Sequence, residues 1–183
     1  GRKPLFNEYK YLENDTMMPK AAYRALYSAY RLGEINKMKK YVELAERDST
    51  KLENIVQYMS EVQLKDKDTI SYVASLKRGF KLSPSHPFFF PRLVDYYNAK
   101  ALTDSATVFI DNALATDSSN VLFLFAKSTD LLNDKNYEQC LDITTKLLEI
   151  NDSMPEAYCN MGLVYYNQAL ELDKTTQRSR KKR

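Results

Sequence analysis

The chain has 183 residues, a length that suits one compact domain or one short array of repeats. Apolar residues make up 44% and charged residues 28%, as in ordinary globular proteins, and only 4 Gly and 6 Pro are present. So few turn-forming residues disfavour an all-β sandwich and favour long helices joined by short connections. The net charge is +3, but the segment 173–183 carries six basic side chains and one acidic one. The remainder is therefore nearly neutral, and we identify in it no basic stripe of the kind that nucleic-acid-binding domains carry.

Helix-type spacing of apolar residues, interrupted by short polar loops, predicts an all-α chain. We expect helices at 19–32, 34–48, 51–64, 68–82, 87–101, 103–116, 120–133 and 135–150, with a last long helix from Pro155. Residues 4–13 also have an amphipathic pattern. The segment 1–18 is therefore predicted to hold an N-terminal cap helix or part of an earlier repeat.

The predicted helices recur at a fixed interval. Pro19, Pro87 and Pro155 are each 68 residues apart, twice the roughly 34-residue period of helix–turn–helix repeats. Frames that start at 19, 53, 87, 121 and 155 place mostly small or apolar residues at matching positions of each second helix. These are Met38, Tyr72, Ala106 and Cys140 at position 20, and Ala45, Gly79, Ala113 and Leu147 at position 27. Small residues at such positions indicate that two antiparallel helices approach each other closely.

This pattern resembles the tetratricopeptide repeat (TPR) family over residues 19–172. The best copies are 87–120 and 121–154, and the turn Gly33-Glu34-Ile35 also matches the family. The resemblance implies a right-handed α-solenoid of about four helix–turn–helix repeats plus an unpaired C-terminal helix. The departures from the family pattern are Gln63, Tyr72, Lys127 and Thr144, and they make the frame at 53 the least regular. An unrelated helical bundle with accidental spacing is the alternative.

The last frame has a first helix and no second one. Residues 173–183 are expected to form a basic extension of that helix or a tail. Solenoids need a capping element over their last apolar face, so Leu163, Tyr165, Tyr166 and Leu170 are expected to be partly exposed. Either the chain is a fragment of a longer protein, or a partner covers this end, with self-association as one option.

Residues that could catalyse a reaction or hold a cofactor are scarce. The single His, His86, lies in a loop, the glycines are isolated, and no metal-ligand spacing occurs, so no enzyme activity, cofactor or metal is expected. Cys140 and Cys159 could form one bridge, but two buried thiols are the favoured interpretation. No apolar run reaches the length of a membrane helix and no signal peptide is recognised. Localisation stays open between the cytoplasm and export with removal of an N-terminal signal.

The TPR resemblance also implies a binding site, because in that family the first helices of the repeats line a concave groove. Carried over by position, the predicted partner-binding groove consists of Tyr23, Arg24, Tyr27, Tyr30, Arg31, Tyr58, Arg92, Asp95, Asn98, Phe125, Asn160 and Tyr166. Tyr and Arg are the residue types that most often anchor protein interfaces. The Lys and Asn clamp with which some family members hold chaperone tails is not reproduced at the corresponding positions, so that ligand is not expected.

Three functions remain in consideration. The first is a protein-interaction scaffold that binds a peptide or protein segment in the groove. The second is a sensory or regulatory input module of a larger bacterial signalling protein. The third is an enzyme or nucleic-acid binder that uses the basic tail, although no nucleic-acid partner and no direct membrane insertion are expected.

Overall fold

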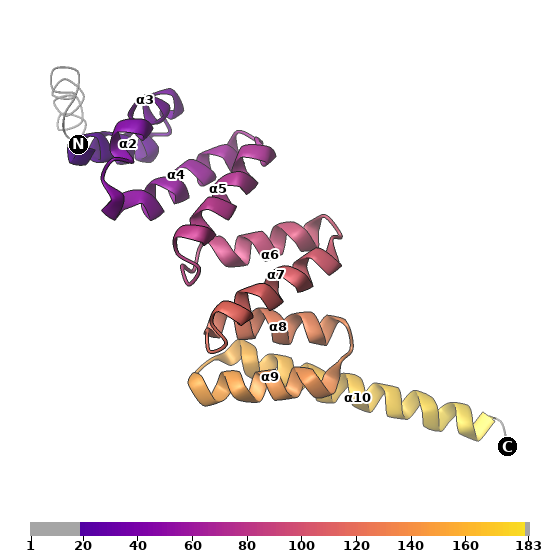
Figure 1. Cartoon of the computed structure of the whole chain (residues 1–183). Helices are drawn as coiled ribbons and strands as arrows, with labels where there is room; N and C mark the ends of the chain where they lie inside the picture. The colour runs from indigo at the N-terminus through magenta and orange to yellow at the C-terminus, as the bar shows by residue number, and fades with distance from the viewer. Residues whose placement is uncertain (1–18, 182–183) are drawn as a thin grey trace. The chain divides into compact units, whose positions relative to one another are not determined.

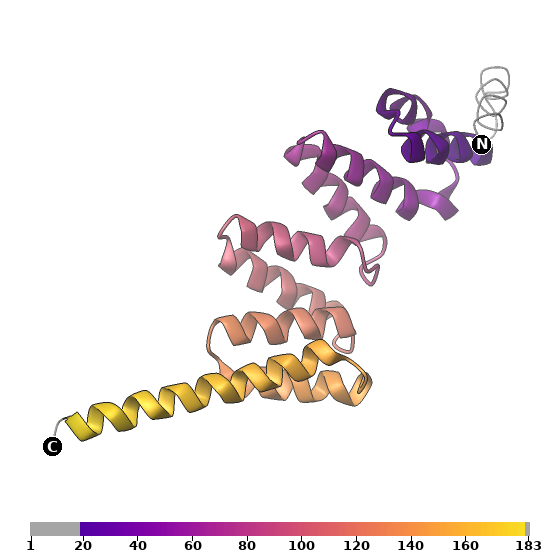
Figure 2. The same ribbon diagram turned by 180° about the vertical axis from the view of Figure 1, so that it is seen from behind.

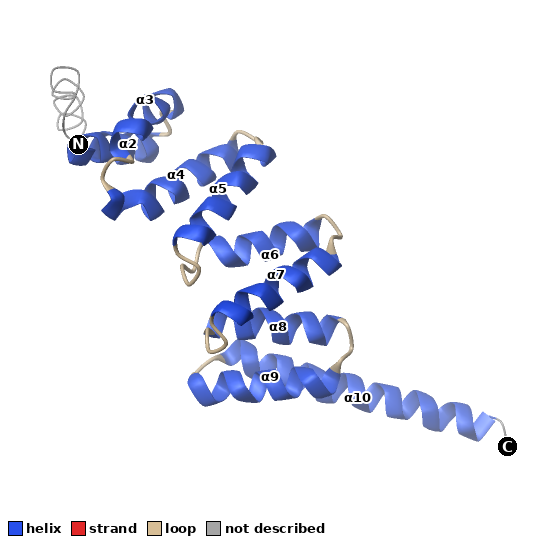
Figure 3. Cartoon of the chain, viewed as in Figure 1, coloured by secondary structure: helices blue, strands red, loops and turns tan. Residues whose placement is uncertain are grey.

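The computed structural model describes residues 19–181, and every regular element in that range is a helix (Figures 1, 2 and 3). This confirms the all-α prediction. The helix expected at residues 4–13 lies outside the described residues. The chain divides into two compact units, residues 1–93 and 94–183, and helix α6 contributes to both.

From residue 19 onward, the first unit contains two helix pairs and the beginning of a third. The elements are α2 (Pro19–Leu32), α3 (Ile35–Ala45), the 3-10 turn η1 (Ser49–Lys51), α4 (Leu52–Lys65), α5 (Thr69–Leu82) and the first half of α6 (Phe89–Ala99). Helix α2 packs mainly on α3, and α4 packs mainly on α5. The core of α2, α3 and α4 includes the fully buried Leu26, Met38 and Ile55. The pair α4 and α5 shows that the least regular frame still forms a helical hairpin.

The second unit continues the same pattern and ends in a single long helix. After α6 come α7 (Thr103–Thr116), α8 (Val121–Asn133), α9 (Tyr137–Ile150) and α10 (Pro155–Lys181). Tyr97 of α6 lies 5.7 Å from Phe109 of α7 between ring centroids. Helix α10 packs on both α8 and α9, and its Ala157 and Val164 are fully buried against them. Residues 173–181 continue α10 without a break.

The turns between paired helices show the repeat most directly. Each contains one residue with positive φ, and these residues lie 34 positions apart: Gly33 (72°), Lys67 (60°), Ala101 (54°) and Lys135 (59°). After each of them, a backbone N–H bonds back to a helical carbonyl five residues earlier, at 2.9–3.0 Å. A left-handed residue followed by such a bond closes the C-terminus of a helix and satisfies its last carbonyl groups. The same cap therefore ends the first helix of four successive repeats.

The predicted small-residue positions are buried. All residues at positions 20 and 27 of the four complete frames lie in the interior, from Met38 and Ala45 to Cys140 and Leu147. The pattern of small residues was therefore a correct guide to helix packing.

Several helix boundaries differ from the prediction by one to three residues, and two of these shifts have local reasons. The helix predicted to reach residue 48 ends at Ala45, because Asp48 accepts hydrogen bonds from the backbone N–H and hydroxyl of Thr50 and starts η1. The helix predicted from residue 87 begins at Phe89. There Pro91, rather than Pro87, occupies the first helical turn, where a missing N–H is tolerated.

Candidate functional site: the tyrosine surface of α2 and α4

Four tyrosines from the first two repeats gather on α2 and α4. We call Tyr23, Tyr27, Tyr30 and Tyr58 the tyrosine cluster. The rings of Tyr30 and Tyr58 are stacked, with centroids 4.5 Å apart and planes 21° apart. Tyr27 lies 5.4 Å from Tyr58 and 6.4 Å from Tyr30 between centroids, tilted against both. Such ring pairs contribute roughly 0.5–1.5 kcal/mol beyond their buried area, so they hold one another in place.

The hydroxyl groups of these tyrosines are bonded within the protein. Tyr30 donates to the Glu61 carboxylate, which also accepts from the Gln57 amide at 3.0 Å. Arg31 donates to the Tyr27 hydroxyl at 3.1 Å. At the other end, Tyr58 is hydrogen-bonded to Tyr23. The polar ends of the rings are therefore fixed before any partner arrives.

This network changes how readily two of the hydroxyls lose their protons. The hydrogen bond to Glu61, with burial and the negative charge of that carboxylate, raises the pKa of Tyr30 to about 12. Burial, followed by the hydrogen bond with Tyr23, raises the pKa of Tyr58 above its ordinary value. Both side chains are thus neutral phenols throughout the physiological pH range.

Cationic side chains surround the cluster. Arg31 lies 5.9 Å from the ring centroid of Tyr27, Lys51 lies 5.8 Å from that of Tyr23, and Lys65 lies 6.0 Å from that of Tyr30. Two more cations, Lys20 and Arg24, are exposed on α2. The sequence analysis missed Lys20, Lys51 and Lys65, although Lys20 and Lys65 occupy groove positions 2 and 13 of their frames and could have been found by the same carry-over.

The other predicted groove residues are distributed over the two units, each with its own surroundings. In the first unit, Arg92 is exposed but tied to the residue just before its own helix, with its guanidinium 3.7 Å from the Phe88 ring centroid and bonded to the Phe88 carbonyl at 3.2 Å. In the second unit, Asp95 and Asn98 are exposed, and Phe125 is half-buried against the core of α8 and α9.

Asn160 is a structural residue in the second unit. It is only 7% exposed, and its amide nitrogen donates to the hydroxyls of Ser128 at 2.7 Å and Thr129 at 3.2 Å. A buried polar group must be hydrogen-bonded, and these bonds connect α10 to α8. We therefore leave Asn160 out of the proposed binding surface.

Helix α10 exposes a wide apolar face. Tyr165 and Tyr166 are 56% and 61% exposed, and Leu163 and Leu170 are also exposed, as the sequence predicted. Self-association through this face stays a prediction.

The two cysteines are unpaired, and the prediction that both are buried is wrong for one of them. Cys140 is buried and Cys159 is exposed. The reason is that α10 packs through Ala157, Asn160 and Val164, which leaves Cys159 on the opposite side of the helix.

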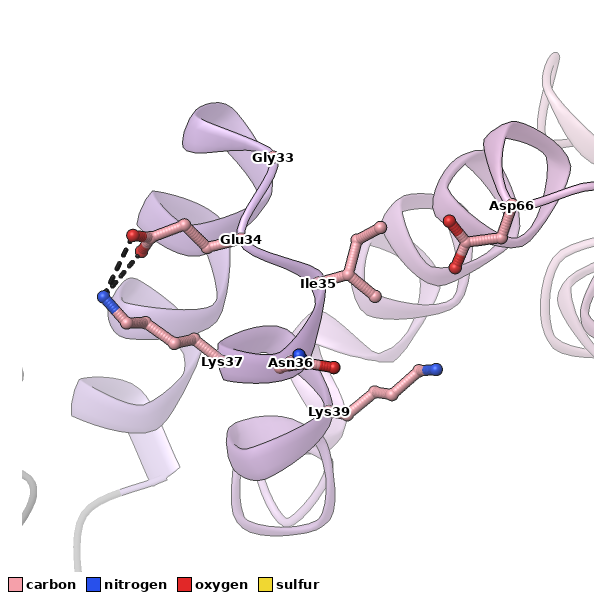
Figure 4. A pocket seen from close by; sticks show the side chains of 7 residues that line it. All are labelled: Gly33, Glu34, Ile35, Asn36, Lys37, Lys39 and Asp66. Carbon is pink, nitrogen blue, oxygen red and sulfur yellow. Dashed lines mark hydrogen bonds and ion pairs between the residues drawn. The ribbon is translucent and has the colours of Figure 1, made fainter.

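One open pocket, of about 500 Å³, lies at the turn between α2 and α3 (Figure 4). It is lined by Gly33, Glu34, Ile35, Asn36, Lys37, Lys39 and Asp66. Glu34 and Lys37 pair with each other at 2.9 Å, and the lining contains none of the predicted groove residues. The pocket lies beside a capped helix end and includes no residue of the tyrosine cluster.

The described part of the chain has neither a metal-binding cluster nor a membrane-spanning helix. No group of three His, Cys, Asp or Glu side chains there is arranged to hold a metal ion. Among the helices of residues 19–181, none combines the length and apolar character needed to cross a membrane.

No known family model and no curated protein matches the chain. Solved structures do match. The structure is similar to that of MamA AMB-1, with a TM-score of 0.53 and 12% identity over 85% of each chain. It is also similar to YrrB, described as a TPR protein with an unusual peptide-binding site, with a TM-score of 0.54 and 17% identity over 85% of this chain and 80% of YrrB.

The chain has a TPR-type repeat fold. In this TPR-like chain the tyrosine cluster lies on α2 and α4, which are the first helices of the frames at 19 and 53.

Proposed function

We propose that this TPR-like chain is a protein-interaction scaffold and that the surface of α2 and α4 binds an extended segment of another protein. The observation that supports the proposal most strongly is the tyrosine cluster itself. Three of its rings contact one another, two of them stacked, and its hydroxyls are bonded internally, so little side-chain freedom is lost when a partner docks.

The exposure of individual side chains fits such a surface. Tyr27 remains 36% exposed although it contacts two other rings, and Arg31 beside it is exposed. Tyr and Arg in this arrangement are the residue types that dominate measured interface energies. A peptide-binding site described for the structurally similar YrrB is a further reason to expect this kind of ligand.

The experiment is a selection of linear peptides from a random display library on the full chain, followed by affinity measurement on the variants Tyr27→Ala and Arg31→Ala. We expect the selected peptides to lose at least tenfold in affinity on each variant. Tyr165→Ala is the matched control, because it removes an exposed tyrosine from the other unit. If the selected peptides bind both α2 variants as tightly as the unmodified chain, the assignment of the site to α2 and α4 is wrong.

A further inference from the structure

The groove face of α2 is composed of tyrosines and cations alone. Its six groove positions are Lys20, Tyr23, Arg24, Tyr27, Tyr30 and Arg31. The whole helix, PKAAYRALYSAYRL, contains no acidic residue. Lys20, Arg24, Tyr27 and Arg31 follow one another at intervals of four, three and four residues, which places them in one line along the helix. We call these four residues the α2 stripe. The sequence analysis did not identify it, because the net charge outside residues 173–183 is close to zero.

Among residues 19–181, two carboxylates lie near the stripe in the contacts described, and both are already hydrogen-bonded. Glu61, in the middle of the surface, accepts hydrogen bonds from Tyr30 and Gln57. Asp48, which lies near Lys20, accepts from Thr50, and that bond is the main cause that lowers its pKa. Within the described residues, neither Arg24 nor Arg31 is paired with a carboxylate.

The hydrogen-bonding character of the surface follows from these contacts. The tyrosine hydroxyls are used internally, so the rings offer a partner mostly carbon surface. Arg31 donates one N–H to the Tyr27 hydroxyl, and its remaining guanidinium N–H groups can donate to a partner. The surface therefore presents donors and positive charge beside apolar rings, and its complement is a segment with carboxylate acceptors and apolar side chains.

We propose, on the basis of the function proposed above, that the segment bound by α2 and α4 is acidic, an extended peptide with Asp or Glu side chains that face Arg24 and Arg31. The stripe gives the spacing. Lys20 to Arg31 spans about 16 Å of helix at ~1.5 Å per residue, which is the length of about five extended residues. Arg24 and Arg31 are about 10 Å apart along the axis, so carboxylates three residues apart in the peptide match them.

Nucleic acid, the other common polyanion, fits less well. Bases bind such surfaces by stacking on open aromatic faces. Here Tyr30 and Tyr58 stack on each other at 4.5 Å, and Tyr27 lies against both, so the ring faces are largely occupied by one another. A protein segment can pack on the exposed ring edges and pair with the cations, so it does not require open ring faces.

The test uses three fluorescein-labelled peptides of equal length on the full chain, read by fluorescence anisotropy. The first carries Glu at positions three residues apart between Leu and Pro residues; the second has Gln, and the third Lys, in place of each Glu. We expect the Glu peptide to bind at least tenfold more tightly than the Gln peptide at low salt, with the advantage falling as salt rises. The Lys peptide is expected to bind most weakly.

Two double variants test whether the Glu peptide binds at the α2 stripe. Arg24→Gln with Arg31→Gln removes two exposed charges from the stripe, and Lys77→Gln with Lys81→Gln removes two exposed charges from α5 as the control. We expect the first double variant to lose at least tenfold in affinity for the Glu peptide and the second to lose less than twofold. Circular dichroism of each variant checks that the helices are retained.

Three results would overturn the inference. The Gln peptide could bind as tightly as the Glu peptide, the stripe variant could bind the Glu peptide unchanged, or a twelve-residue oligothymidine could bind as tightly as the Glu peptide with the same loss on the stripe variant. Failure here is separable from failure of the proposed function. Selected peptides that are neutral or basic but still depend on Tyr27 would refute the acidic segment and leave the binding surface standing.

Discussion

Gly79 gives the sharpest test of how closely the helices pack. It lies in the interior of α5 (Thr69–Leu82), and a Cβ at this position would come within 2.2 Å of the Phe89 ring carbon Cε1. Ordinary carbon contacts are roughly 3.5–4.0 Å. The ring cannot shift freely, because Phe89 is fully buried and lies 4.9 Å from His86 and 5.3 Å from Phe88 between ring centroids.

Two effects of Gly79→Ala oppose each other. Alanine is favoured over glycine inside a helix by about 1 kcal/mol. Overpacking a filled core costs roughly 1–3 kcal/mol, and the depth of this overlap places it at the upper end. We expect a net loss of about 2 kcal/mol of unfolding free energy. Gly162 is the matched control: it also lies inside a helix, but a Cβ there meets nothing within 4 Å, so Gly162→Ala is expected to gain about 1 kcal/mol.

The assay is urea unfolding followed by circular dichroism, with the midpoint and slope compared across variants. A further variant, Phe89→Leu, makes room for the added methyl group. Combined with Gly79→Ala it should be more stable than the sum of the two single changes predicts, because the two sites are in contact. If Gly79→Ala is as stable as the unmodified chain, α5 and α6 do not approach at this point and the packing argument fails.

Three other predictions follow from local features. The side-chain oxygen of Gln63 is buried with no hydrogen-bond partner among the described residues, so Gln63→Leu should raise the unfolding free energy by about 1 kcal/mol; a lower urea midpoint would contradict this. Ala101 has φ 54°, a conformation that costs an L-residue roughly 1–2 kcal/mol, so Ala101→Gly should stabilise the chain by up to about 1 kcal/mol, and unchanged or lower thermal stability would count against it. Because the pKa of Tyr30 is raised to about 12, the stability from its bond to Glu61 is complete below about pH 10 and is lost as the pH rises through the folded-state value. Glu61→Gln should lower this pKa toward 10 in a tyrosine titration followed by NMR, and no change would show that the bond is absent.

Much of the fold was contained in the sequence, because the features that specify it are local and recur. Apolar spacing identified every α-helix of residues 19–181, though not the 3-10 turn η1, and the 68-residue interval between prolines indicated the repeat. Small residues such as Ala106 and Ala113 marked the close helix contacts, since only small side chains fit where two helices approach. The positions of the tyrosine cluster on first helices were also predictable from the repeat frame.

The tertiary structure decided what each of those positions does. Asn160 and Tyr27 both hold groove positions, yet Asn160 bonds to buried hydroxyls on a neighbouring helix while Tyr27 remains exposed beside Arg31. Glu61 brings a negative charge to this surface, but its carboxylate accepts hydrogen bonds from Tyr30 and Gln57. Among the described residues, neither Arg24 nor Arg31 forms an ion pair. The hydrogen bonds of Tyr30 to Glu61 and of Asn160 to Ser128 join residues that are 31 or 32 positions apart in the sequence and lie on different helices. Whether such a bond forms depends on how closely the two helices pack, and the spacing of residues along the sequence does not give that.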